Sequence, residues 1–116
     1  MSSVAFQPWV GRNYGRGSRW GVSVLLLGYS HYHEFQEVGH AEYTRHVVGR
    51  HVRGINDRSP YRTKLARAFE CTDGRGAFWD SVAFYNYVQD FMTGPRENPD
   101  PQQIRAAWTP FNEVFR

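Results

Sequence analysis

An apolar run from Val22 to Leu27 constrains the fold of this chain more than any other feature. A run of this length that ends at a glycine, here Gly28, is typical of a β-strand buried on both faces. In open α/β sheets, ligands bind just beyond the carboxyl ends of such strands. The polar and aromatic residues from Gly28 to Glu34 are therefore the first candidates for a functional site.

Length and composition favour a single small domain, residues 1–116, with an ordinary apolar fraction of 41%. The net charge of +3 comes almost entirely from arginine, which suits phosphate and stacks on bases, although a GC-rich genome explains the same bias. Cys71 is the single cysteine, so no intramolecular disulfide can form. We expect a cytoplasmic, reducing setting, with no signal peptide and no membrane span.

The segment before the first expected strand is rich in glycine and carries only basic charges. Arg12, Arg16 and Arg19 alternate there with aromatic side chains, and no acidic residue precedes Glu34. A loop of this composition suits a nucleic-acid backbone, so we expect the three arginines to contact DNA phosphates. The structural alternative is an arm that packs its tryptophans on the core, and the two roles are compatible.

Further elements follow from periodicity and from capping signals. Helices are expected at 40–54, from 60 to about 70 and from 101 to 108, with a helical turn at 77–81, a second strand at 82–89 and a last helical turn up to 116. This order predicts a layered α/β fold with a parallel β-sheet flanked by helices. Two strands make a poor sheet, so the architecture is expected to be incomplete.

Two motifs resemble the uracil-DNA glycosylase superfamily. The segment 25–33, Leu-Leu-Leu-Gly-Tyr-Ser-His-Tyr-His, resembles the family's first motif, in which a buried strand ends in Gly, two variable residues, Pro and an aromatic residue. The segment 82–86, Val-Ala-Phe-Tyr-Asn, resembles the family's second strand, which ends in a base-reading Asn. The similarity runs from about Phe6 to the end and covers the N-terminal half of the family's domain. It implies an incomplete uracil-DNA glycosylase-like fold.

The resemblance also implies a binding site. Enzymes of this family flip a base out of the duplex into a pocket and read its Watson–Crick edge. Asn86 would read the base through its side-chain amide, which offers a donor and an acceptor. Gly28 and Tyr32 would form part of the pocket, with the Tyr32 ring excluding bulkier bases, and His33 would line the pocket mouth. DNA is the implied partner.

The same resemblance leaves catalysis open. Ser30 stands where well-known members have a carboxylate that orients water, and a hydroxyl is a poor general base at neutral pH. His31 replaces the proline of the motif. The late His-containing loop of the family has no counterpart in this sequence. Base-excision activity, an N-glycosidic bond hydrolysis, is thus an implied chemistry for which Ser30 and His31 are the candidate catalytic residues.

Other interpretations remain open. Gly28-Tyr29-Ser30 after a strand is similar to the nucleophile motif of SGNH-type esterases, but that mechanism needs a later histidine and none follows His51. The five histidines suggest zinc, yet no cysteine pair accompanies them, so we expect no metal and no cofactor.

A non-catalytic binding or structural module is the main alternative. A first strand without its second neighbour would also favour a homo-oligomer joined through the exposed sheet edge.

Overall fold

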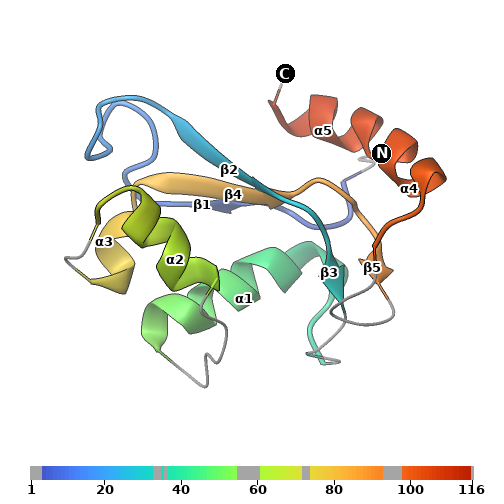
Figure 1. The fold of residues 1–116 in the computed structure, drawn as a ribbon, viewed down its shortest axis with the longest axis horizontal. Coiled ribbons are helices and arrows are strands. Elements are labelled where there is room, and N and C mark those ends of the chain that lie inside the picture. Colours follow the sequence, from blue (N-terminus) through green and yellow to red (C-terminus); the bar gives the residue numbers. More distant parts are fainter. Residues whose placement is uncertain are drawn as a thin grey trace.

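The computed structural model describes residues 4–32, 35, 37–54, 61–71, 74–92 and 98–115. Within these residues the chain is a small α/β domain, with a three-stranded sheet ordered β1-β4-β2 and helices on both of its sides (Figure 1). The strands of this sheet are β1 (Trp9–Val10), β2 (Val24–Gly28) and β4 (Val82–Asn86). The helices are α1 (His40–Arg53), α2 (Tyr61–Ala68), α3 (Arg75–Trp79), α4 (Pro101–Ala106) and α5 (Trp108–Phe115).

The helices lie close to where the sequence predicts them. α1 ends at Gly54, whose φ of 70° places it in the left-handed region that glycine adopts without strain. α4 begins with a capping box, in which the Asp100 side chain accepts a hydrogen bond from the Gln103 backbone N–H at 2.8 Å and the Gln103 side chain accepts one from the Asp100 N–H at 2.9 Å. Ser59 and Pro60, the expected cap of α2, lie outside the described residues.

The two predicted strands are adjacent and parallel, as expected, and the pairs run from Val24 beside Val82 to Gly28 beside Asn86. The sheet as a whole is mixed rather than parallel. β1 runs antiparallel to β4, with Trp9 beside Phe84, because the N-terminal segment folds back along the second predicted strand. The sequence pattern of β1, only two residues long, gave no sign of this pairing.

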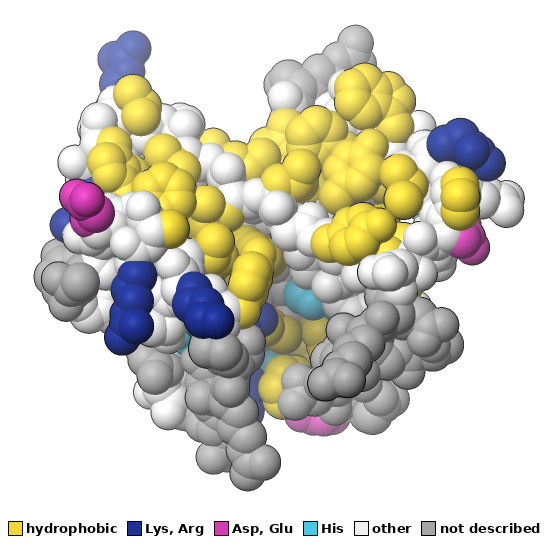
Figure 2. Space-filling view, viewed as in Figure 1, with side chains coloured by type: hydrophobic (Ala, Val, Ile, Leu, Met, Phe, Trp, Pro, Cys, Tyr) yellow, Lys and Arg dark blue, Asp and Glu magenta, His cyan; other side chains and the backbone are white. Residues whose placement is uncertain are grey.

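The prediction that the first strand is buried on both faces is wrong. β4 is the central strand and all five of its residues are buried, whereas β2 lies at one edge of the sheet and Leu27 is 51% exposed. An apolar run specifies a strand but not how many neighbours it has. Figure 2 shows apolar side chains spread over the side of the molecule that carries β2 and the C-terminal helices.

A second, two-stranded sheet forms beyond the carboxyl ends of β2 and β4. It pairs β3 (His31–Tyr32) with β5 (Phe91–Met92) in parallel. Neither segment was among the expected strands, because two-residue strands show no alternation that a sequence pattern can reveal. This small sheet continues the parallel relationship of the main strands and holds the segment after Gly28 in place.

The core lies between the sheet and α1 to α3. Val48, Phe78, Trp79, Val82 and Phe84 are all buried there. The N-terminal segment adds Trp9 and Trp20 to this core. The Trp9 indole N–H donates to the Trp79 carbonyl at 2.9 Å, which confirms the predicted packing role of this arm. On the other face of the sheet, Tyr85 packs against Phe111 and Phe115 of α5. None of the described helices has the length and apolar character needed to cross a bilayer.

Candidate functional site

A cavity of about 310 Å³ lies at the carboxyl ends of the two parallel strands, where the sequence places the first candidate site. This volume is at the lower end of the range for small-molecule sites, roughly 300–1,000 Å³. Aromatic and apolar side chains form most of the wall, and a few polar groups converge among them. The residues that line the cavity are Tyr29, Ser30, His31, Tyr43, Val47, Tyr61, Arg62, Phe84 and Asn86.

Asn86, the predicted base-reading residue, lines this cavity and is only 5% exposed. It lies beside Gly28 across the parallel strand pair. A Cβ atom at residue 28 would overlap the Asn86 amide oxygen and would come within 2.8 Å of the Phe84 ring. Gly28 therefore does more than end the strand, because its missing side chain leaves the space that the Asn86 amide occupies.

The backbone beyond both strands is fixed by hydrogen bonds. The Tyr87 N–H donates to the Gly28 carbonyl at 3.0 Å, and the Val88 N–H donates to the Tyr29 carbonyl at 2.9 Å. Gln89 adds a second constraint, since its amide N–H donates to the Asn86 carbonyl at 2.7 Å while its amide oxygen accepts from the Phe6 N–H at 2.8 Å. These contacts hold Asn86 on a rigid support, which favours precise recognition.

His31, a predicted catalytic residue, is a buried member of the cavity wall. Its Nε2 atom shares a hydrogen bond of 2.8 Å with the Thr44 hydroxyl, and its ring packs edge-on against Phe6 and Tyr43. Burial, and secondly the positive charge of Arg62, lower the pKa of His31 from 6.5 to about 4. The imidazole is therefore neutral at pH 7 and offers the cavity a polar edge rather than a charge.

The structure describes the other candidate residues to different extents. Ser30, the second catalytic candidate, lines the cavity together with Tyr29. The backbone of Tyr32 lies in β3 beside Met92, four positions beyond Gly28 along the chain, and its side chain is outside the described part of the structure. His33 lies outside the described residues altogether.

Several lining residues were not predicted from the sequence. Tyr43 and Val47 lie one turn apart on α1, and Tyr61 and Arg62 begin α2. Tyr43 and Val47 belong to the apolar stripe that predicted the first helix, and Tyr61 to the stripe of the second. That stripe identifies the face that packs inward, but it does not say which part of the face borders a cavity. Arg62 follows Tyr61 directly and is one of the basic residues of α2, so nothing in its sequence position indicated a cavity.

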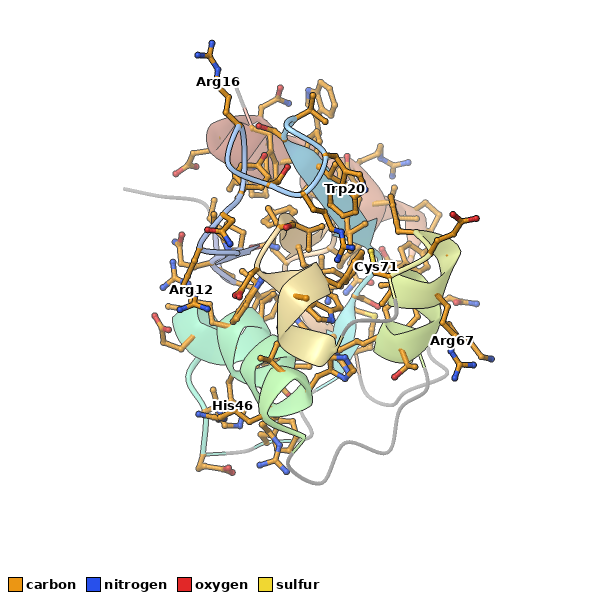
Figure 3. The ribbon with its side chains drawn as sticks, turned by 90° about the vertical axis from the view of Figure 1, so that its left-hand side faces the viewer. Arg12, Arg16, Trp20, His46, Arg67 and Cys71 are labelled. Carbon is orange, nitrogen blue, oxygen red and sulfur yellow. The ribbon has the colours of Figure 1, made fainter. Side chains whose placement is uncertain are left out.

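Arg12, Arg16 and Arg19 lie at the other end of the sheet. They belong to the loop between β1 and β2, which connects to the amino end of the parallel pair, whereas the cavity is at the carboxyl end. Arg12 is 84% exposed and pairs with Asp80 at 2.9 Å. Figure 3 shows Arg12 and Arg16 on this loop and Arg67 on α2, across the molecule from them. The structure thus separates the predicted phosphate contacts from the predicted base site.

Neither the described side chains that could bind a metal nor the comparisons with known proteins assign a function to this cavity. Within the described residues, no group of three His, Cys, Asp or Glu side chains is placed to hold a metal ion. Comparison of the chain with protein-family models, curated proteins and solved structures finds no match. A functional interpretation therefore depends on the chemistry of the cavity itself.

Proposed function

We propose that this protein binds a nucleobase in the cavity at the carboxyl ends of β2 and β4, in the manner of a uracil-DNA glycosylase-like domain. The main support is Asn86, a buried side-chain amide that lines the cavity and is held against Gly28. An amide presents a donor and an acceptor side by side, which matches the edge of a pyrimidine such as uracil. The rings of Tyr29, Tyr43 and Phe84 offer apolar contact for a planar ligand.

Hydrolysis of an N-glycosidic bond is the chemistry that the family resemblance adds to this proposal. The described cavity lining supplies a hydroxyl from Ser30 and a neutral imidazole from His31, and it includes no carboxylate. Loss of one well-placed electrostatic group typically reduces catalysis on the order of a hundred- to a thousand-fold. We therefore expect the chain to bind a base without robust excision, which makes a non-catalytic binding module the second candidate function.

Binding of free uracil tests the proposal directly. A ligand of this size has few atoms to contribute, so we expect a dissociation constant on the order of 1 mM, suited to ligand-observed NMR. The variant Asn86→Ala should weaken binding at least about tenfold, because a buried polar edge of the base then lacks its partner. Asn13→Ala is the matched control, since Asn13 is exposed in the loop at the other end of the sheet. Absence of uracil binding by the folded wild-type chain would contradict the proposal.

Excision is measured separately, as release of uracil from single-stranded DNA. We expect little or no release by residues 1–116, and no rescue by Ser30→Asp. Robust release that Asn86→Ala abolishes would instead establish the chain as an active glycosylase. The two assays together separate base binding from bond cleavage.

A further inference from the structure

The chain ahead of β1 packs directly behind the cavity. Residues 4–8 form a strap that lies outside every described helix and strand. The Phe6 side chain of this strap is completely buried, and its ring lies 5.2 Å from the ring of His31 and 6.3 Å from the ring of Tyr43, measured between centroids. His31 and Tyr43 both line the cavity. The strap is therefore the layer that supports this part of the cavity wall.

Gln89 joins the strap to Asn86. The amide oxygen of Gln89 accepts hydrogen bonds from the Ala5 N–H at 2.9 Å and from the Phe6 N–H at 2.8 Å. The amide nitrogen of the same side chain donates to the Asn86 carbonyl at 2.7 Å. A side-chain amide supplies both an acceptor and a donor, so one group holds the strap and the backbone of Asn86 at the same time.

Further contacts attach the strap to α1. The Gln7 N–H donates to the Ala41 carbonyl at 3.1 Å, and the Arg45 Nε–H donates to the Pro8 carbonyl at 3.2 Å. A segment that is held by single hydrogen bonds, without a helix or a strand ladder of its own, opens at a lower free energy than the protein as a whole. Opening of the strap would leave the cavity wall without the layer behind it.

We propose that docking of the strap regulates the cavity, and that Gln89 is the positioning residue that couples this docking to base recognition by Asn86. The inference rests on the proposed nucleobase site and adds its regulation. In the docked state Gln89 orients the Asn86 backbone, and the Phe6 ring supports the cavity wall. In the open state both constraints are lost and the base binds more weakly. Because such coupling is reciprocal, a bound base stabilises the docked strap by the same factor by which docking strengthens binding.

Amide hydrogen exchange of the wild-type chain measures this coupling. At a uracil concentration about ten times the dissociation constant, exchange of the Ala5 and Phe6 amides should slow by up to about tenfold, the limit for an open state that does not bind. The amides of Gly11 and Asn13 are the internal control, because their hydrogen bonds lie at the other end of the sheet and should not respond. Uracil that binds without slowing the strap amides, or that slows all four amides equally, overturns the inference.

Gln89→Glu separates the two contacts of this side chain. At pH 7 a carboxylate still accepts from the Ala5 and Phe6 N–H groups but cannot donate to the Asn86 carbonyl. The strap amides should keep their protection without ligand, and uracil should bind about fivefold more weakly, the size of one neutral hydrogen bond. Uracil should also no longer slow exchange of the strap amides.

Gln102→Glu is the matched control, because Gln102 is exposed on α4 and does not line the cavity. It should leave uracil affinity and strap exchange as in the wild type. Unchanged affinity and coupling in Gln89→Glu, or the same losses in Gln102→Glu, overturn the inference. The exchange experiment on the wild-type chain decides the inference without any variant, in case Gln89→Glu does not fold. Failure of uracil to bind the folded wild-type chain removes the nucleobase proposal itself, whereas binding without a response of the strap removes only its regulation.

Discussion

Gly28 and Asn86 are partners across the parallel strands β2 and β4, and the Asn86 amide oxygen occupies the space where a side chain at residue 28 would begin. This relationship joins the fold to the site. The glycine that ends the apolar strand also lets the amide lie against the backbone and border the cavity. Any side chain at position 28 must displace Asn86, Phe84 or the strand itself.

We therefore predict that Gly28→Ala removes uracil binding and lowers the free energy of unfolding by about 1–3 kcal/mol, the usual cost of an overpacked interior. Gly49→Ala is the control. Gly49 lies inside α1, where an added Cβ would meet nothing within 4 Å apart from its chain neighbours and the backbone of its own helix, so its replacement should stabilise the protein by up to about 1 kcal/mol. Denaturant unfolding and ligand-observed NMR check both variants. Unchanged uracil binding by Gly28→Ala would show that the position of the Asn86 amide does not determine recognition.

The location of Asn86 shows what the sequence could and could not predict. The apolar run that ends at Gly28 and the β-branched and aromatic run at 82–89 sufficed to predict two parallel strands, and the family resemblance of 82–86 placed Asn86 at the end of the second. The edge position of β2 agrees with the expected missing neighbour, whereas the partial exposure of its side chains did not follow, because an apolar run does not reveal how much of each face other elements cover. The pairing of β1 did not follow either, since a two-residue strand has no periodicity.

The residues that line the cavity could not be predicted from the sequence for a related reason. Tyr43 and Val47 belong to a stripe that packs α1 on the sheet, and only the relative placement of α1, α2 and the strands decides which part of that stripe borders empty space. Arg62 is one of several basic residues on α2, and its sequence position does not distinguish it from a charge on a solvated helix face. The separation of the loop arginines from the cavity depends on strand direction, which becomes clear only when the elements are assembled.

Burial of the His31 ring makes the free energy of unfolding depend on pH. Its pKa is about 4 in the folded chain and 6.5 in the ordinary unfolded reference, chiefly because burial disfavours the charged imidazole. Between these two values the unfolded chain binds more protons, so stability is present above pH 6.5 and is lost as the pH falls toward 4. The loss from this one group should reach about 3 kcal/mol.

His31→Gln tests this dependence, because glutamine keeps an amide for the Thr44 hydroxyl and does not titrate. Urea unfolding between pH 7 and pH 4.5 should show a smaller loss of unfolding free energy in the variant than in the wild type, by about 2–3 kcal/mol. The comparison of the two proteins cancels the contribution of the carboxylates that they share. Parallel pH profiles would mean that His31 is not held neutral by the fold.

The arginine-rich loop is expected to bind DNA independently of the cavity. Arg12, Arg16 and Arg19 lie at the amino end of the strand pair, so a strand of DNA held there need not place a base beside Asn86. We predict weak binding without sequence preference, and replacing the three arginines by glutamine should reduce the salt slope by about one unit per lost phosphate contact. Free uracil binding should be unchanged in the same variant. DNA binding that does not respond to salt, or none at low salt, would contradict this role for the loop.

The outer edge of β2 is the remaining feature with a direct consequence. In the described part of the chain β2 pairs with β4 alone, and β1 lies beside β4 rather than beside β2. The strand is apolar, Val22 and Leu27 are exposed, and no charged residue lies between Arg19 and Glu34. Natural edge strands usually carry a charge, a proline or a bulge that prevents pairing with another chain, and a row of unpaired N–H and C=O groups without such protection is a template for association.

We predict that the chain self-associates through this edge, and that a single charge on β2 prevents it. Leu27→Lys should shift the protein from oligomer to monomer in sedimentation at micromolar concentration, because a desolvated ammonium group opposes strand pairing. Val10→Lys is the matched control, since Val10 is 56% exposed on β1, at the opposite edge of the same sheet, and should leave the oligomer intact. A wild-type chain that sediments as a folded monomer would contradict the prediction. An oligomer that Val10→Lys disrupts and Leu27→Lys does not would assign the interface to the β1 edge.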